Sequence, residues 1–290
     1  MNRQRFHAMK RTCLFLLAAL IVFLPRDAQA APSPERLFCI HPFMRPSDLL
    51  ERFTPMAKWL SEASGVTFRL KVYSSYGTHI NDVGENQCDI AYMGPIPYLR
   101  VITRYGKKPV LAQLEVNGKS TFNGSIVVRT ESPLTSIEQV RGKRFAFGDV
   151  HSSMGNVLPR IHLRKVGITL EDLGAHGHLN GHDNVALSVL SGRFEVGAVK
   201  ESVFRKYATR GLRELDRIPE IGTHLFVTRS DLSPTLIKTL SQTLVEMKRS
   251  FVGRSILTAI KPSITGLNAV DPNYDARLLP LVSIIDQLEE

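Results

Sequence analysis

Cysteine is scarce in this chain, and no apolar run is long enough to span a membrane. Three cysteines occur in 290 residues, and only Cys39 and Cys88 lie outside the N-terminal segment described below. They can form one disulfide in an oxidising compartment or remain two buried thiols, and the sequence leaves both possibilities open. The apolar run from Cys13 to Leu24 is shorter than the roughly 20 residues that a transmembrane helix needs. Tandem repeats, low-complexity stretches and Gly/Ser-rich linkers are absent, which excludes a repeat array.

Motifs of common catalytic and nucleotide-binding sites are also missing. No Gly-x-Ser-x-Gly elbow occurs, and Ser152, His182 and Asp183 make a poor triad because adjacent His and Asp rarely orient each other. The glycines near residue 150 fit neither the dinucleotide fingerprint nor the phosphate loop. Basic residues are scattered and no nucleic-acid motif is present, so nucleic acid is not an expected partner.

The first thirty residues read as a secretory signal. Four basic residues precede the apolar run, and Ala28-Gln29-Ala30 follows it, which predicts an exported protein with cleavage after Ala30. An uncleaved N-terminal anchor is the alternative, and the context of the cysteines predicts no lipid anchor. Removing residues 1–30 takes away five basic residues and one acidic residue, so the formal charge falls from +10 to +6. A moderately basic exported protein suits an anionic ligand or an anionic membrane surface.

The rest of the chain predicts an α/β fold with two lobes. Strands at 37–41, 67–73 and 89–93 alternate with helices, which indicates a mostly parallel sheet covered on both faces. Strands at 110–116 and 124–129 are assigned to the same region, and an α/β pattern restarts after Pro133. Two extended stretches, 126–131 and 219–226, are expected to connect the regions. We therefore expect a discontinuous first lobe (31–128 and 225–290) and an inserted second lobe (129–224), hinged at two crossings.

The later elements are predicted from the same patterns. Helices are expected at 136–140, 154–166, 184–190, 201–207, 234–251, 255–260 and 274–287, and strands at 144–148, 194–199 and 225–229. Ligands of such sheets bind outside the carboxyl ends of the strands. The loops after Met93, Phe147 and Val199 should therefore face the cleft between the lobes.

The segment from Arg144 to Pro159 carries the strongest functional signal. A short apolar strand ends at Gly148, and Ser152 and Ser153 precede a helix that begins near Gly155. Free N–H groups, two hydroxyls and the helix dipole would together form an anion site. Ordinary helix capping is the alternative, but it needs only one hydroxyl.

Other candidate residues are less specific. His176, His178 and His182 suggest a metal cluster, but the spacing matches no structural zinc pattern and Asp183 is the only nearby acid. His182 is better explained as a second donor to the cleft, with Asp183 capping a helix. Tyr76 and Tyr98 either line the cleft or pack with a wet hydroxyl. Lys200 either points its ammonium into the cleft or lies on the surface.

Together these residues resemble the phosphate/phosphonate-binding family of periplasmic solute-binding proteins that feed ABC transporters. The similarity covers nearly the whole chain after residue 30. It is carried by Pro42, Leu49–Leu60, Tyr76, Asp89–Tyr98, Ser125–Arg129, Gly142–Phe147, Ser152–Gly155, Pro159, Gly181–Asp183, Ser191–Gly192 and Glu195–Val199. The resemblance implies a two-lobe periplasmic-binding-protein fold of type II.

The resemblance also implies roles for particular residues. Ser152 and Ser153 match the first two hydroxyl donors of the family's Ser-Thr-Ser-Gly turn, whereas Met154 replaces the third. Tyr76 and His182 match the family's cleft tyrosine and histidine.

Several other family positions are altered in this chain. A second family tyrosine falls at Phe122, and the acids that hold an aminophosphonate's ammonium fall near Ser202 and His224. The loss of those acids argues against an amine-bearing ligand, since its ammonium would be buried unpaired. His224 or Lys200 could supply positive charge in their place.

The expected function is capture of a small oxyanion, such as a phosphonate, phosphate or phosphite, for ABC-type uptake. Ser152, Ser153, Gly155, His182, Tyr76, Lys200 and Tyr98 are the expected ligand-binding residues. The protein is expected to be a monomer that needs no cofactor or metal, performs no catalysis and docks on a permease. One alternative is a ligand sensor that signals to a membrane kinase. The other is a periplasmic metal-dependent hydrolase that uses His176, His178, His182 and Asp183.

Overall fold

The computed structural model describes residues 35–289. The expected signal segment and its cleavage site after Ala30 lie outside these residues. Within the described residues no helix combines the length and apolarity that crossing a membrane requires.

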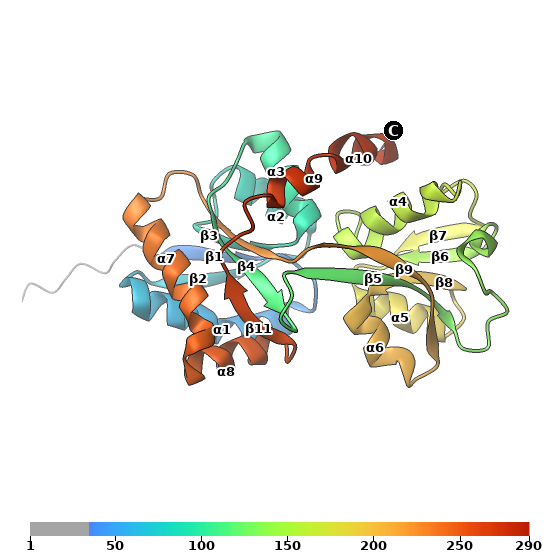
Figure 1. The fold of residues 1–290 in the computed structure, drawn as a ribbon, viewed down its shortest axis with the longest axis horizontal. Helices are drawn as coiled ribbons and strands as arrows, with labels where there is room; N and C mark the ends of the chain where they lie inside the picture. Colours follow the sequence, from blue (N-terminus) through green and yellow to red (C-terminus); the bar gives the residue numbers. More distant parts are fainter. Residues whose placement is uncertain (1–34, 290) are drawn as a thin grey trace, which may run out of the picture. The chain divides into compact units, whose positions relative to one another are not determined.

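The first sheet has six strands in the order β11-β4-β10-β3-β1-β2 (Figure 1). β1 pairs in parallel with β2 and β3, whereas β10 and β11 run antiparallel to their neighbours. β1, β2, β3 and β4 thus run in one direction, as expected of a mostly parallel sheet, and β10 and β11 run in the other. β10 arrives from the second sheet, so no strand–helix–strand crossover fixes its direction. The bounds are β1 (Arg36–Ile40), β2 (Phe68–Val72), β3 (Ile90–Met93), β4 (Val110–Val116), β10 (Leu225–Thr228) and β11 (Ile264–Asn268).

The second sheet has five strands in the order β7-β6-β8-β5-β9. β6 pairs in parallel with β7 and β8, and β5 runs antiparallel to β8 and β9. This sheet is mixed as well, for β5 and β9 enter and leave it as extended connections to the first sheet. The bounds are β5 (Thr121–Arg129), β6 (Arg144–Phe147), β7 (Ala175–His178), β8 (Val196–Lys200) and β9 (Leu212–Gly222).

Helices flank both sheets (Figure 1). Around the first sheet are α1 (Pro46–Ser64), α2 (Tyr76–Gly84), α3 (Pro95–Tyr105), α7 (Pro234–Glu246), η3 (Met247–Arg249), α8 (Phe251–Ile260) and α9 (Tyr274–Leu278). The C-terminal α10 (Leu281–Glu289) contacts Arg160 and Arg164 beside the second sheet. Around the second are η1 (Ile137–Val140), η2 (Ser153–Val157), α4 (Leu158–Lys165), α5 (His182–Leu190) and α6 (Glu201–Ala208). The expected single helices at 234–251 and 274–287 are each divided.

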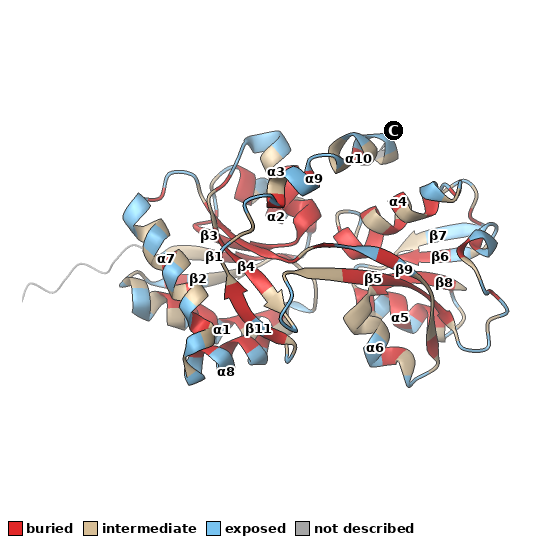
Figure 2. Ribbon diagram, in the orientation of Figure 1, coloured by how far each residue is buried: buried red, intermediate tan, exposed pale blue. Residues whose placement is uncertain are grey.

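Alternation along the central strands places the core on both sides of the first sheet. Phe38 and Ile40 of β1 pack in one cluster with residues of α1, α7 and α8, whereas Cys39 packs in another with residues of α2 and α3. Successive side chains of a strand point to opposite faces, so a fully apolar strand needs helices on both. Figure 2 shows the central strands of both sheets as buried and the outer faces of the helices as exposed.

The chain crosses between the sheets twice. β4 ends at Val116 in the first sheet and β5 begins at Thr121 in the second, so this crossing precedes the expected 126–131. The return, between Gly222 of β9 and Leu225 of β10, falls within the expected 219–226. The segment 124–129 was assigned to the first region but lies in the second sheet. The division into lobes at 128 and 224 stays a prediction.

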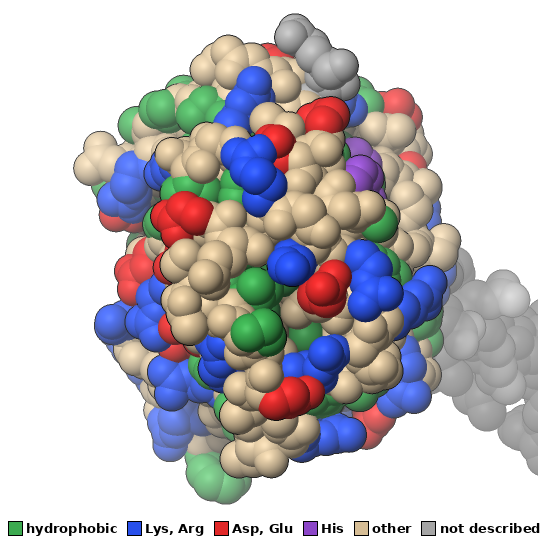
Figure 3. Space-filling view, turned by 90° about the vertical axis from the view of Figure 1, so that its right-hand side faces the viewer, with side chains coloured by type: hydrophobic (Ala, Val, Ile, Leu, Met, Phe, Trp, Pro, Cys, Tyr) green, Lys and Arg blue, Asp and Glu red, His purple; other side chains and the backbone are tan. Residues whose placement is uncertain are grey.

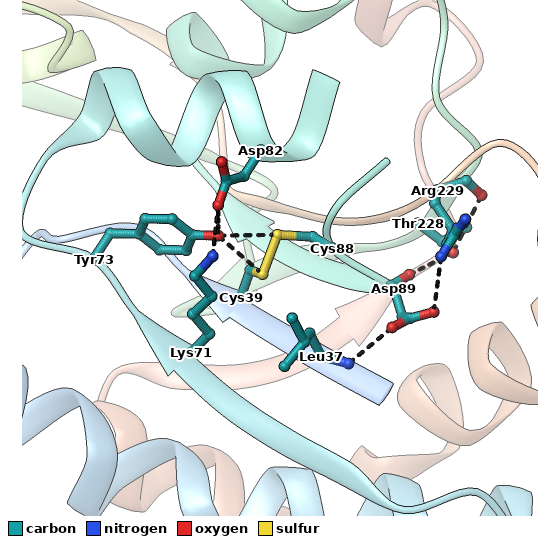
Figure 4. Close-up of a disulfide and its surroundings, with 9 residues drawn as sticks. All are labelled: Leu37, Cys39, Lys71, Tyr73, Asp82, Cys88, Asp89, Thr228 and Arg229. Carbon is teal, nitrogen blue, oxygen red and sulfur yellow. Dashed lines mark hydrogen bonds and ion pairs between the residues drawn. A yellow bond between two sulfur atoms is a disulfide. The ribbon is translucent and has the colours of Figure 1, made fainter. Parts of the chain in front are cut away.

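Cys39 and Cys88 form a disulfide, which answers the question that the sequence left open. It ties the end of β1 to the residue pair that precedes β3. The Tyr73 hydroxyl lies 3.4 Å from Sγ of Cys39 and 3.3 Å from Sγ of Cys88, and donates to Asp82 at 2.7 Å (Figure 4). Lys71 pairs with the same carboxylate at 2.6 Å. The bridge is thus buried beneath a hydrogen-bonded tyrosine.

Candidate functional site

The carboxyl ends of strands from both sheets meet at Gly94, which directly follows β3. A methyl group built on Gly94 would lie 3.5 Å from Oγ of Ser153, 3.6 Å from Nε2 of His224 and 3.7 Å from Cε1 of His41. His41 follows β1, Ser153 follows β6, and Lys200, at the end of β8, lies next to His224. The expected convergence of the loops after Met93, Phe147 and Val199 is confirmed.

The two serines have different partners. Ser152 is the N-cap of η2, and its Oγ accepts the N–H of Gly155 at 3.1 Å. The Oγ of Ser153 accepts the N–H of Ile96 in α3 at 3.1 Å, which joins elements of the two sheets. Ile96 lies between Pro95 and Pro97, which have no N–H, so it supplies the one donor of these first three helical positions. Capping of η2 therefore uses the Ser152 hydroxyl, whereas the Ser153 hydroxyl contacts the first turn of α3.

Gly155 allows the turn to pack closely. A Cβ on Gly155 would lie 2.8 Å from Oγ of Ser152 and 3.1 Å from Cα of Gly148, whose N–H donates to the Gly155 carbonyl at 2.7 Å. Ser153 and Met154 open a π-helical turn, so their N–H groups have no acceptor within the helix. The Met154 side chain is fully buried in the core, so residue 154 offers the site its backbone alone.

Four basic side chains, His41, His182, Lys200 and His224, surround this point, and we call them the basic cluster. Nζ of Lys200 lies 3.4 Å from Nε2 of His224, and Nδ1 of His182 accepts the Lys200 N–H at 3.3 Å. The rings of His41 and His224 have centroids 5.2 Å apart.

Aromatic rings enclose the basic cluster. The Lys200 ammonium lies 5.3 Å from the Phe43 ring and 5.6 Å from the Phe122 ring. His224 stacks on Tyr92 at 5.1 Å. Low-polarity walls strengthen electrostatic interactions within the site.

Burial makes the charged forms of the basic cluster unfavourable. Desolvation lowers the pKa of His41, His182 and His224 well below the ordinary value, and mutual repulsion, with Lys200 among the neighbours, adds to it. Desolvation, with the nearby Lys261, lowers the pKa of Lys200 to about 7. No carboxylate among the described residues is a cause of any of these four shifts. These buried basic groups therefore lack a counter-charge, an environment that a bound anion would stabilise.

His41 is the site residue that sequence reasoning missed. Its side chain is 1% exposed, and neither ring nitrogen has a hydrogen-bond partner. Buried polar groups are normally satisfied, so the ring is available to a ligand or to water. The sequence interpretation treated it as the end of the apolar strand at 37–41. The signal available was its position at the carboxyl end of a parallel strand, directly before Pro42.

A small pocket opens beside the basic cluster. Its lining residues are Pro42, Phe43, Tyr76, Gly148, Asp149, Ser152, Gly181 and His182. Asp149 is the only carboxylate among these, and its Oδ1 accepts the His151 N–H at 2.8 Å. Burial, with the charge of Asp149, raises the pKa of Tyr76, so its hydroxyl stays a donor. Ser152, Tyr76 and His182 therefore lie in one pocket, as expected.

Tyr98 does not share this environment. Its hydroxyl donates to Oδ1 of Asp275 at 3.0 Å, and its ring lies 6.0 Å from that of Tyr274. Its N–H donates to the Gly94 carbonyl at 3.0 Å, so it lies a full turn into α3, and its side chain packs against α9. The expected cleft-lining role is replaced by packing with a hydrogen-bonded hydroxyl.

The histidines proposed for a metal are dispersed. His176 and His178 lie on β7, where Nε2 of His178 is 3.0 Å from Oδ1 of Asn156, and His182 begins α5. Residues 35–289 contain no group of three or more His, Cys, Asp or Glu arranged for a metal ion. Asp183 does not cap α5, because Gly181 is the N-cap, and it pairs instead with Lys206 at 2.6 Å.

Comparison with known families shows to which protein family the chain belongs. The family model described as "ABC transporter, phosphonate, periplasmic substrate-binding protein" matches residues 38–274. The chain belongs to this family. The resemblance read from the sequence is confirmed, and the protein is a periplasmic solute-binding protein of the phosphonate type that serves an ABC transporter.

Individual relatives are distant. A probable ABC transporter phosphite-binding protein, PhnD1, from Prochlorococcus marinus is 22% identical over 198 residues, which cover 64% of this chain and 67% of the relative. The structure of PhnD1 from the same organism in complex with methylphosphonate is 18% identical, with a TM-score of 0.78 over 89% of this chain and 100% of that chain. A binding-protein component of an ABC phosphonate transporter from Pseudomonas aeruginosa is 17% identical, also with a TM-score of 0.78, over 89% and 88% of the two chains. The expected α/β fold of two helix-flanked sheets is confirmed.

Proposed function

We propose that the ligand is a small tetrahedral oxyanion of the phosphonate, phosphite or phosphate type, held where the two sheets meet. The observation that carries this proposal is the buried basic cluster beside Gly94. It combines basic side chains that have no carboxylate partner within residues 35–289 with the N-terminal ends of α3 and of the η2–α4 segment. Helix N-termini and uncompensated basic groups both favour an anion.

The proposed ligand contacts follow from the same geometry. The Ile96 N–H donates to Ser153 Oγ in this structure, and we propose that both groups donate to an oxygen of the ligand when it binds. The N–H groups of Ser153 and Met154 are further donors. Ser152 and Gly155 shape the turn, and Tyr76 and His182 donate from the adjacent pocket. Lys200 and His224 supply the positive charge.

The relatives guide the choice of candidate ligands. PhnD1 is named a probable phosphite-binding protein, and its structure contains methylphosphonate. The position of His224 in this site gives a bound ammonium no carboxylate to pair with, which favours ligands without an amine. Accordingly, we propose a monomeric carrier that is exported by cleavage after Ala30, performs no catalysis and presents its closed, loaded form to a permease.

A thermal-shift screen of the mature protein tests the ligand class. The anions are phosphate, phosphite, methylphosphonate and sulfate, with neutral and cationic solutes alongside them. At roughly a hundredfold excess over Kd, a bound ligand stabilises the protein by about 2.7 kcal/mol. We expect at least one tetrahedral oxyanion to raise the melting temperature. A response only to a neutral or cationic solute would contradict the proposed ligand class, but it would not contradict the fold.

The variant Ser153→Ala tests the proposed contact. Loss of one hydroxyl contact to a charged group weakens affinity by about 1.5–3 kcal/mol, or more than tenfold. Ser64→Ala is the matched control, because that hydroxyl donates to its own helix at the Leu60 carbonyl, outside the site. Equal affinities for the two variants would exclude Ser153 as a ligand contact.

A further inference from the structure

The basic cluster holds more potential positive charge than one ligand charge can balance. His41 faces His224, His79, Lys200 and His182, and Lys261 acts on His182, Lys200 and His224. Of the acidic groups near these residues, Asp149 acts on Tyr76 and Glu201 acts on Lys261. Neither is a cause of the shifts in the cluster itself. Each added proton therefore repels the next until an anion enters.

We propose that this site selects tetrahedral oxyanions by charge, preferring doubly charged anions to singly charged anions of the same shape, and that His41, His224 and Lys200 take up protons as the anion binds. This inference rests on the proposed function, because it assigns the basic cluster to the same ligand. The inference adds two statements to the proposed function: that the preferred ligand carries two negative charges, and that the protein gains protons when the ligand binds.

The geometry places these three groups around one anion. Ser153, His224 and His41 all lie within 3.7 Å of a methyl group built on Gly94, and Nζ of Lys200 is 3.4 Å from the imidazole of His224. An oxyanion that accepts from Ser153 therefore lies beside all three. A first negative charge balances one protonated group, and only a second makes protonation of another favourable in a buried site.

The unpartnered ring of His41 makes it a group that can donate to the ligand once it gains a proton. Both its nitrogens are buried without a hydrogen-bond partner, so a protonated ring has a free donor for the ligand. Phe43 packs at 5.0 Å from the His41 ring and also faces the Lys200 ammonium, which limits water at both groups. The anion, rather than water, then balances the added charge.

Titration calorimetry with isosteric ligands tests the inference. Methylphosphonate and methanesulfonate share a tetrahedral head and a methyl group, and at mildly alkaline pH they carry two charges and one. We expect methylphosphonate to bind at least about tenfold more tightly. Sulfate, which stays doubly charged and carries no proton, is expected to bind more tightly than methanesulfonate. Repeating the sulfate titration in buffers of different ionisation enthalpy should show net proton uptake from the buffer. Because sulfate does not bind these protons, they must bind to groups of the protein.

Variants identify the residues that take up the protons. His41→Asn and Lys200→Met should each lower the proton uptake and narrow the preference for the dianion, whereas Lys238→Met on α7 should change neither. Equal affinities for methylphosphonate and methanesulfonate, or no proton uptake with sulfate, would overturn charge selection while oxyanion binding itself stands. No binding of any oxyanion would overturn the proposed function and this inference together. The wild-type titrations decide the matter even if a variant fails to fold.

Discussion

At the scale of single residues, the proposed site depends on the absence of a side chain at Gly94. The backbone of Gly94 is extended, with φ −77° and ψ 168°, so an L side chain is sterically allowed there. The nearest atoms to an added Cβ, in Ser153, His224 and His41, lie at ordinary contact distances of 3.5–3.7 Å. A methyl group would therefore fit beside Gly94, in contact with the side chains of Ser153, His224 and His41.

Gly94→Ala should abolish anion binding without unfolding the protein. The added methyl fills the position between Ser153 and His224 that the ligand would occupy. Because glycine is also the N-cap of α3, we expect a stability loss of only about 1 kcal/mol. Calorimetry measures the binding and urea unfolding measures the stability. Retained affinity in a folded variant would place the ligand elsewhere.

Lys200 is expected to destabilise the ligand-free protein. Its folded-state pKa is about 7 against an ordinary 10.5, so between these values the unfolded state binds more protons than the folded state. The free energy of unfolding should therefore rise with pH across this window. Lys200→Met should stabilise the ligand-free protein at neutral pH by about 1–3 kcal/mol, with a smaller gain as the pH rises.

Urea unfolding at several pH values, with Lys238→Met as control, measures this difference. The same variant should bind the oxyanion more weakly than the wild type. A variant that is less stable at neutral pH, or a gain that grows with pH, would show that Lys200 is already balanced in the ligand-free protein.

At the scale of elements, the disulfide fixes the strand that leads to His41. Cys39 lies on β1, two residues before His41, which follows the strand, and Cys88 lies two residues before β3, whose end leads to Gly94. Asp89 adds to this link, since its carboxylate accepts the N–H of Leu37 at 2.8 Å (Figure 4). The same carboxylate pairs with Arg36 at 2.7 Å. The two strands that lead into the site are thus held together by covalent and polar contacts.

Replacing both Cys39 and Cys88 by alanine should cost about 2–4 kcal/mol of stability, because the bridge closes a loop between residues 49 apart. Urea unfolding of the double variant and of the oxidised wild type measures the loss. Thiol titration of the unfolded wild type should detect no free thiol from this pair. Equal stabilities, together with two titratable thiols, would contradict the bridge.

Elements with a clear hydrophobic period could be predicted from the sequence, and those governed by long-range pairing could not. β9 was missed because Arg213, Glu214, Asp216 and Arg217 interrupt its apolar pattern, which is tolerated on an edge strand. β11 was missed beside Pro262, and the first crossing was placed too late because the apolar β5 suits either sheet. Strand order depends on pairing between distant segments, which local periodicity does not specify.

The candidate site shows the same limit. The sequence could propose Ser152, Ser153, His182, Tyr76 and Lys200 because each follows a predicted strand or begins a predicted helix. Tyr98 was misplaced since one further turn of α3 directs its side chain to α9. His41 was missed because a histidine within an apolar strand does not reveal which group will face it. The loops of the two sheets determine that, and they come together only in the fold.

At the scale of the whole molecule, charge is distributed differently inside and outside. On the face seen in Figure 3, basic and acidic side chains are interspersed, without a single-sign patch of the kind that binds nucleic acid. The basic groups whose pKa shifts have no carboxylate among their causes lie instead in the buried basic cluster, to which residues at the strand ends of both sheets contribute. This arrangement suits a carrier that encloses one small anion.

The central claim is that an oxyanion binds at the junction of the two sheets, and a crystal structure of the mature protein with methylphosphonate tests it most directly. We predict phosphonate oxygens within hydrogen-bond distance of Ser153 Oγ and the Ile96 N–H, with Lys200 and His224 beside them. Methylphosphonate bound only elsewhere, for instance at the surface pocket lined by Arg160 and Arg164, would contradict the account.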